Sequence, residues 1–185
     1  QTQSEPSMFV KILVDDQDKV TDYLIVAAFS DDIRFFGTDN LIDRYMTDVK
    51  SKIKVKFEKP PVLEFVSIET HQDLKRQLTE LKMPKYWSKA SIAFSSVFEG
   101  GMKIRKVPLT VLDEKVLLTK ATDAEIREAK GLPSAEMTGV MSYPAGNCKF
   151  EMRYVISLLG SHRSGFSVAQ FNICKKAFEY GYATR

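Results

Sequence analysis

The sequence predicts a single α+β domain, mainly an antiparallel sheet of hairpins with three to four helices. Short segments rich in Val, Ile and Phe alternate apolar with polar residues, as strands do. They come in pairs separated by turn residues, and other segments repeat apolar residues at helical spacing. A length of 185 residues with 44% hydrophobic and 28% charged residues suits one globular domain, placed at 8–185 after a flexible polar tail at 1–7.

The first third of the domain is expected to contain a hairpin, a helix and a second pair of strands. The hairpin joins strands at Met8–Val14 and Tyr23–Phe29 through the turn 15–18, because four turn-forming polar residues separate two apolar runs. A helix starts at Thr38 or Asp39, both good N-caps. Strict alternation predicts a strand at Lys50–Phe57, and Val62–Ile68 forms the next strand after a turn at 58–61.

The rest of the domain is expected to alternate short helices with strands. Leu74, Leu78 and Leu81 predict a helix closed by Pro84. Two glycines at 100–101 predict a type I′ turn because both of its central residues need positive φ. The remaining expected elements are strands at 90–98, 102–107, 109–112, 116–119 and 150–158, and two capped helices. One helix has the capping-box pair Thr122 and Glu125, and the last is capped by Ser167 and Gln170 and runs to about Tyr180.

Charge is distributed unevenly along the chain, although the formal net charge is only +3. Residues 1–48 hold ten acidic and four basic side chains, whereas residues 49–110 hold thirteen basic and six acidic ones. Such asymmetry can steer charged partners or order self-association.

Four lysines give the sequence its first candidate site. Lys50, Lys52, Lys54 and Lys56 would project from one face of the predicted strand, about 6.6 Å apart. That spacing suits the phosphates of an extended nucleic-acid strand or a plane of anionic lipid headgroups. The structural alternative is an edge strand protected by lysines against aggregation. Lys103 and Arg105 would join the site if their strand folds beside it.

A loop between the last predicted strand and helix is the second candidate. Its Gly160 and Gly165 have the spacing of a phosphate-binding loop, but Phe166 stands where that motif has lysine, which argues against nucleotide hydrolysis. Amides at the start of the helix, with His162 and Arg163 nearby, could still hold an anion.

No catalytic residue, metal site or cofactor is predicted. His71 and His162 are isolated, and Cys148 and Cys174 have no ligand spacing and are expected to be free thiols. The acidic turns lack the glycine and glutamate of a calcium loop. These observations favour a binding or assembly protein over an enzyme.

The last helix and the sole tryptophan suggest contacts with other molecules. The helix has two apolar strips, one of which contains Ile173 and Tyr180, so it is either buried twice or meets another protein or a second copy. Tyr86 and Trp87 are amphipathic and lie beside lysines, as interface residues often do.

The layout resembles matrix proteins of negative-strand RNA viruses: a basic strand region, then a C-terminal strand, loop and helix ending KAFEYG at 176–181. The proline-rich budding motif of many such proteins is absent. The resemblance implies a non-enzymatic, self-associating protein that docks on a polyanion, either nucleic acid or an anionic membrane. The alternative is a small protein- or ligand-binding module without that role. Cytoplasmic localisation, with peripheral membrane attachment or an exported form left open, is expected from the thiols and from the lack of an apolar run of membrane-spanning length.

Overall fold

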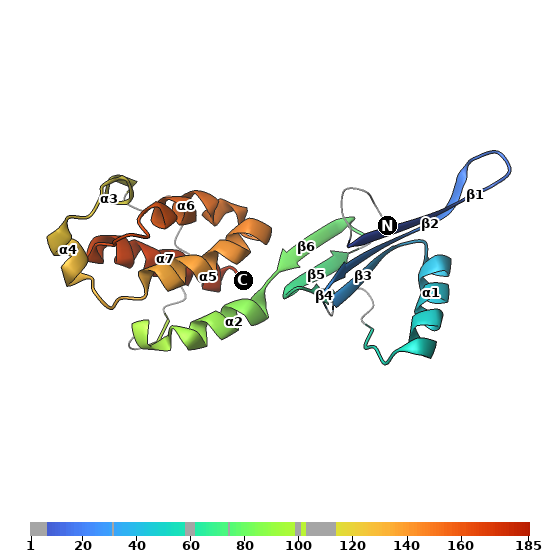
Figure 1. Cartoon of the computed structure of the whole chain (residues 1–185), viewed down its shortest axis with the longest axis horizontal. Helices are drawn as coiled ribbons and strands as arrows, with labels where there is room; N and C mark the ends of the chain where they lie inside the picture. Colours follow the sequence, from blue (N-terminus) through green and yellow to red (C-terminus); the bar gives the residue numbers. More distant parts are fainter. Residues whose placement is uncertain (1–6, 31, 58–61, 74, 99–100, 103–113) are drawn as a thin grey trace. The chain divides into compact units, whose positions relative to one another are not determined.

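A computed structural model describes residues 7–30, 32–57, 62–73, 75–98, 101–102 and 114–185. It is a mixed α+β chain with antiparallel sheets, as predicted (Figure 1). The chain divides into two compact units, unit 1 at Gln1–Glu80 and unit 2 at Leu81–Arg185. The sequence predicts one domain over 8–185, because no linker composition marks this division, which falls inside a strand.

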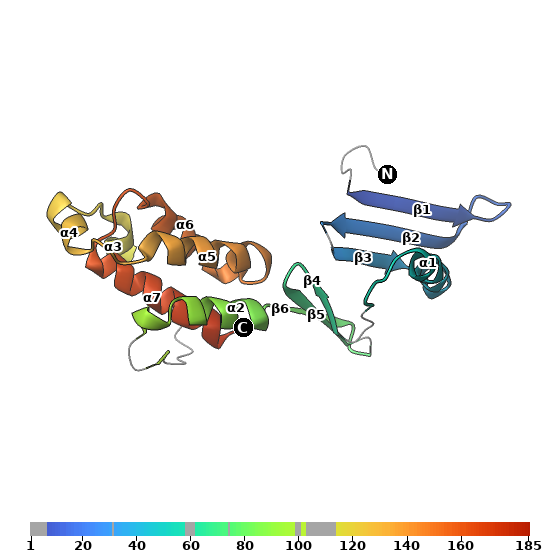
Figure 2. The same ribbon diagram turned by 60° about the horizontal axis from the view of Figure 1, so that its bottom comes forward.

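Unit 1 opens with the predicted hairpin. Strands β1 (Met8–Val14), β2 (Val20–Phe29) and β3 (Asp32–Gly37) form an antiparallel sheet in that order (Figure 2). Asp15 shapes the β1–β2 turn, since its Oδ1 accepts hydrogen bonds from the amides of Gln17 and Lys19. Ser7, which the sequence assigned to the tail, precedes β1 and is held to the sheet because its carbonyl accepts the amide of Ala28.

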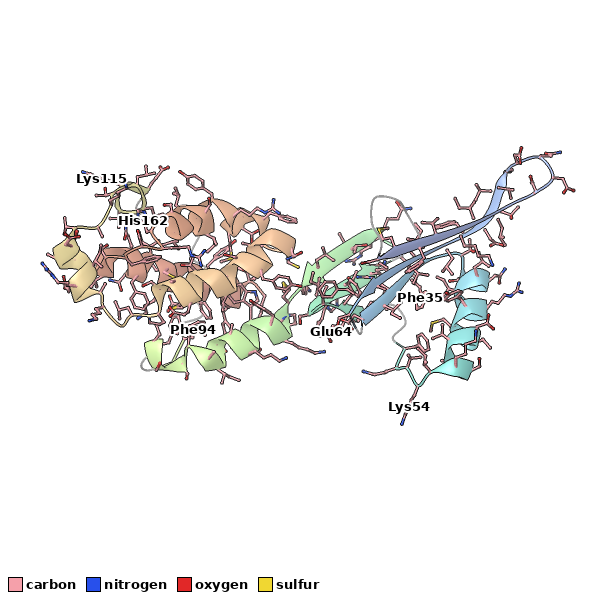
Figure 3. All side chains as sticks on the ribbon, viewed as in Figure 1. Phe35, Lys54, Glu64, Phe94, Lys115 and His162 are labelled. Atoms are coloured by element: carbon pink, nitrogen blue, oxygen red, sulfur yellow. The ribbon has the colours of Figure 1, made fainter. Side chains whose placement is uncertain are left out.

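Helix α1 (Asp39–Lys52) covers one face of this sheet. Its N-cap is Thr38, as predicted, but the Thr38 hydroxyl donates to Asp22 of β2 at 2.7 Å and not to the helix. Leu24 of β2 is buried, and Phe35 of β3 contacts Tyr45 of the helix with ring centroids 6.0 Å apart (Figure 3). The helix therefore packs on the face that carries Leu24 and Phe35.

The next segment is a three-stranded sheet, where the sequence predicted one strand and a helix. Strands β4 (Val62–Phe65), β5 (Ile68–Asp73) and β6 (Leu78–Lys82) follow one another. Val66 and Ser67 both have positive φ, 45° and 65°, so a tight turn splits the expected strand without the glycine or asparagine that would announce it. The amide of Val66 donates to Asp32 at 3.1 Å, which links this turn to the first sheet.

Unit 2 is helical beyond the end of β6. Pro84 begins a helix here and does not close one, as proline suits the first helical turn. The described residues form seven α-helices in the whole chain, more than the three to four expected. Those of unit 2 are α2 (Pro84–Ala93), α3 (Glu114–Leu118), α4 (Asp123–Glu128), α5 (Ser134–Asn147), α6 (Arg153–Ser161) and α7 (Val168–Ala183), with 3-10 turns η1 (Ser95–Val97) and η3 (Phe150–Met152).

Three of the predicted strands are helical in the structure. Residues 90–98 belong to α2 and η1, and residues 116–119 largely to α3. The alternation at 150–158 was misleading, because Val155, Ile156 and Leu159 are buried at helical spacing while Phe150 and Tyr154 are each 57% exposed. The expected elements at 58–61, 103–107 and 109–112 lie outside the described residues.

The core of unit 2 is built around α7. Phe178 of this helix contacts Trp87, Phe94 and Phe98 with ring centroids 5.4–5.7 Å apart. Trp87 and Phe178 are fully buried, and the capping boxes predicted at Thr122 and Ser167 are both present. Four aromatic rings thus join α2 and the turn that follows it to α7.

Candidate functional site: a basic segment at the end of α1

The four lysines do not form a strand face. Lys50 and Lys52 belong to the last turn of α1, and residues 54–57 have no regular structure. The strand prediction was wrong because Leu41, Met46 and Val49 continue the helical stripe of α1 up to the first lysines. Two positions apart on a helix are about 200° apart around its axis, so Lys50 and Lys52 point in different directions.

The lysines nevertheless remain together on the surface of unit 1. All four are exposed, and residues 49–57 contain no carboxylate. Figure 3 shows the side chain of Lys54 pointing away from the ribbon. We call residues 50–57 the basic segment.

Aromatic contacts hold the basic segment on the rest of unit 1. Phe57 contacts Phe35 of β3 with ring centroids 6.5 Å apart, and the ammonium of Lys50 lies 4.9 Å from the centre of the Phe57 ring. Phe35 in turn contacts Tyr45, which is 43% exposed. The segment therefore combines exposed cationic side chains with an aromatic base packed on β3.

Stabilisation of helix α1 explains only two of the four lysines of the basic segment. The C-terminal end of a helix carries a partial negative charge, so Lys50 and Lys52 in the last turn stabilise α1. Lys54 and Lys56 lie beyond the helix end, where this effect has faded. Their presence is what makes the segment a candidate binding site.

The other predicted anion ligands do not join the basic segment. Lys103 and Arg105 lie outside the described residues, and Arg163 is exposed on unit 2. His162 is buried between α3 and α6, where its Nε2 is hydrogen-bonded to the carbonyl of Leu117 (Figure 3). The expected strand before this loop is the helix α6, so the phosphate-loop geometry is absent.

The predicted interface residues are mostly part of the core. Trp87 is fully buried and Ile173 is 5% exposed. Tyr180 is half-buried, and its hydroxyl donates to Glu151 at 3.4 Å. Most of the two apolar strips of α7 is therefore buried within unit 2. Self-association through this helix stays a prediction.

Tyr86 has a defined structural role. Pro144 lies inside α5 and has no N–H, so the carbonyl of Val140 four residues earlier lacks its helical donor. The hydroxyl of Tyr86 donates to this carbonyl at 2.8 Å. Burial raises the pKa of the Tyr86 phenol, which keeps the hydroxyl protonated as a donor. A side chain from α2 thus replaces the missing bond of α5.

We expect Tyr86→Phe to lower the free energy of unfolding by about 1 kcal/mol, because it leaves the Val140 carbonyl unpaired. In a Pro144→Ala background the alanine N–H can donate to Val140, so the same substitution should cost almost nothing. Urea unfolding of the four proteins of this double-mutant cycle measures the coupling. Equal losses in both backgrounds would contradict this role for Tyr86.

A cleft of about 680 Å³ lies in unit 2 among its described residues. Phe98, Leu132 and Phe171 line it together with Lys175 and Glu179 of α7. The ammonium of Lys175 lies 5.6 Å from the centre of the Phe98 ring and 6.0 Å from that of Phe171. A purely apolar pocket without basic neighbours would have favoured a small ligand-binding module, and this lining is mixed.

The described residues contain no group of three or more side chains that could hold a metal ion. No helix among them is both long and apolar enough to cross a membrane. Cys148 and Cys174 are free thiols, as expected, and burial raises the pKa of Cys174 to about 11. The thiol of Cys174 therefore stays protonated at neutral pH.

The aromatic base of the basic segment has no signal in the local sequence. Phe35 and Phe57 are 22 positions apart, and only the packing of α1 on β3 brings them together.

Comparison of the chain with protein-family models, with curated proteins and with solved structures finds no match.

Proposed function

We propose that the protein binds a polyanion, a single-stranded nucleic acid, through the basic segment of unit 1, without catalysing a reaction on it. The observation that carries the proposal is the concentration of four exposed lysines within seven residues that hold no carboxylate. Phosphates of a nucleic acid release bound counterions when lysines replace them, which favours binding at low salt.

Two features favour nucleic acid over a membrane surface. The half-buried Phe57 lies beside Lys50 and contacts Phe35, which in turn contacts the exposed Tyr45. Aromatic rings next to cations can stack on unpaired bases. The segment offers one exposed aliphatic side chain, Ile53, for insertion into lipid. Stable attachment to a membrane requires more apolar area than that.

The loss of the predicted strand changes the expected mode of binding. Lysines on a regular strand would match phosphates one by one, whereas lysines on a helix end and an irregular segment point in several directions. Binding is therefore expected to be independent of sequence and dominated by charge. The resemblance to viral matrix proteins gains no support here, because its C-terminal strand is the helix α6.

We expect wild-type protein to bind single-stranded RNA with a log–log salt slope of about −3, since about four phosphate contacts form. Affinity should then fall about 50-fold between 50 and 200 mM salt. Fluorescence anisotropy with a labelled oligonucleotide measures this. The variant with Lys50, Lys52, Lys54 and Lys56 all changed to Gln should lose most of the binding and most of the slope.

Matched controls separate this site from general attraction to a basic protein. Lys54→Gln/Lys56→Gln is compared with Lys115→Gln/Lys120→Gln, which removes the same charge from exposed positions of unit 2. Only the first pair should weaken binding. The proposal is refuted if the two pairs of substitutions weaken RNA binding equally. It is also refuted if the protein binds anionic vesicles but does not bind RNA.

A further inference from the structure

The face of the first sheet opposite α1 is an unusually apolar surface. Residues on one face of an antiparallel sheet alternate along each strand and align across strands. The register places Val10, Ile25 and Phe36 in one row, with Ile12 and Tyr23 in the next row on the same face. We call this set, together with Arg34, the open sheet face.

Most of these side chains are exposed although they belong to a regular sheet. Val10, Ile12, Tyr23 and Phe36 are 44%, 55%, 44% and 47% exposed. Helix α1 cannot cover them, because it packs on the face that carries Phe35. Contiguous apolar patches of this kind mark interaction surfaces in soluble proteins.

Opposite charges lie at the two ends of the open sheet face. Arg34 is at one end, half-buried over the ring of Phe36, with its guanidinium carbon 5.3 Å from the ring centre. Burial lowers the pKa of Arg34. Within the residues that the structure describes, no carboxylate is found at ion-pair distance from it, and nearby Asp32 accepts the amide of Val66. The guanidinium is therefore partly desolvated, with no oppositely charged partner in the part of the chain that the structure describes.

The β1–β2 turn lies at the other end. It carries Asp15, Asp16 and Asp18 against Lys19, a net charge of −2. Arg34 pairs with Ala27 of β2, whereas the turn ends just before Val20, the first residue of that strand. Ala27 and Val20 are seven residues apart along β2, so Arg34 and the turn are separated by about 23 Å in the strand direction.

We infer that the open sheet face binds the same face of a second copy of this chain, related by a two-fold axis. An antiparallel face-to-face arrangement brings Arg34 of each copy onto the acidic turn of the other and stacks the apolar rows between them. An isologous contact of this kind repeats each pairing twice and closes on itself. Sheets commonly pack face to face within about 30° of alignment.

The size of the face sets the expected strength. Three strands about 4.8 Å apart and about 23 Å long offer a face of roughly 300 Å² in projection. Standard interfaces bury about 800 Å² of accessible surface on each partner. The dimer is therefore weak and reversible, and it forms at high protein concentration.

Sedimentation velocity from micromolar to near-millimolar protein tests the inference with the full chain. The wild-type protein should shift from monomer to dimer, and Ile12→Asp should weaken association at least about tenfold because it would bury a charge. Ile92→Asp serves as the matched control, since Ile92 of α2 is 74% exposed in unit 2. Wild-type protein that remains monomeric throughout overturns the inference, as does an Ile12→Asp variant that associates like wild type.

A charge exchange tests the arrangement of the two copies. Arg34→Glu and Asp16→Arg should each weaken the dimer, whereas the double variant should restore most of the association because the two signs are exchanged. Asp16 is chosen because Asp15 holds the turn through its hydrogen bonds. Circular dichroism checks that each variant is folded. If the double variant loses as much association free energy as the two single variants lose together, the two-fold arrangement is refuted.

Discussion

Replacing Trp87 with alanine is expected to lower the free energy of unfolding by about 3–5 kcal/mol, because it empties the centre of the unit 2 core. The indole is fully buried and contacts Phe178 edge to face at 5.4 Å. Its N–H has no hydrogen-bond partner among the described residues, so its removal recovers part of the loss and favours the lower end of that range. Urea unfolding followed by far-ultraviolet circular dichroism measures the effect.

Ile92→Ala is the control for this prediction. Ile92 lies on the same helix but is 74% exposed, so its truncation should change the free energy of unfolding by less than about 0.5 kcal/mol. A loss below about 1 kcal/mol for Trp87→Ala would show that the aromatic cluster does not hold α2 onto α7.

Gln170→Leu is expected to cost about 2–4 kcal/mol although it conserves volume, because it removes three hydrogen bonds that the buried Gln170 side chain makes to backbone groups. Gln170 is 1% exposed. Its Oε1 accepts the amide of Ser167, and its Nε2 donates to the carbonyls of Val116 and Thr119 at 3.3 and 2.7 Å. One side chain thus caps the start of α7 and the end of α3.

Thermal and urea unfolding of Gln170→Leu are compared with those of Asn172→Leu, an exposed polar position on the same helix. The control is expected to remain close to wild type. If both variants unfold alike, the Gln170 hydrogen bonds contribute no more than a surface residue does.

Local signals predicted the parts of the fold that local chemistry determines. The hairpin of β1 and β2 follows from alternation around an aspartate-rich turn, and both capping boxes were predicted from Thr122 and Ser167. Errors arose where tertiary packing overrides local preference. Helix α5 contains Gly139, Pro144 and Gly146, which disfavour helices, and it was not predicted.

The lysines of the candidate site could be identified from the sequence, but their arrangement in space could not. Lysines alternating with apolar residues resemble a half-buried strand, but Ile53 is 53% exposed and the segment begins as a helix. Alternation indicates a strand only when one side is buried, and burial depends on contacts distant in sequence. The same limit concealed the contact of Phe57 with Phe35.

The position of Trp87 also determines what optical spectroscopy can report. It is the single tryptophan of the chain and lies in the core of unit 2, whereas tyrosines occur in both units. Selective excitation at long ultraviolet wavelengths therefore observes the helical unit alone. Its emission maximum follows the opening of that core, while the β-rich unit, which holds the basic segment and the open sheet face, is silent at those wavelengths.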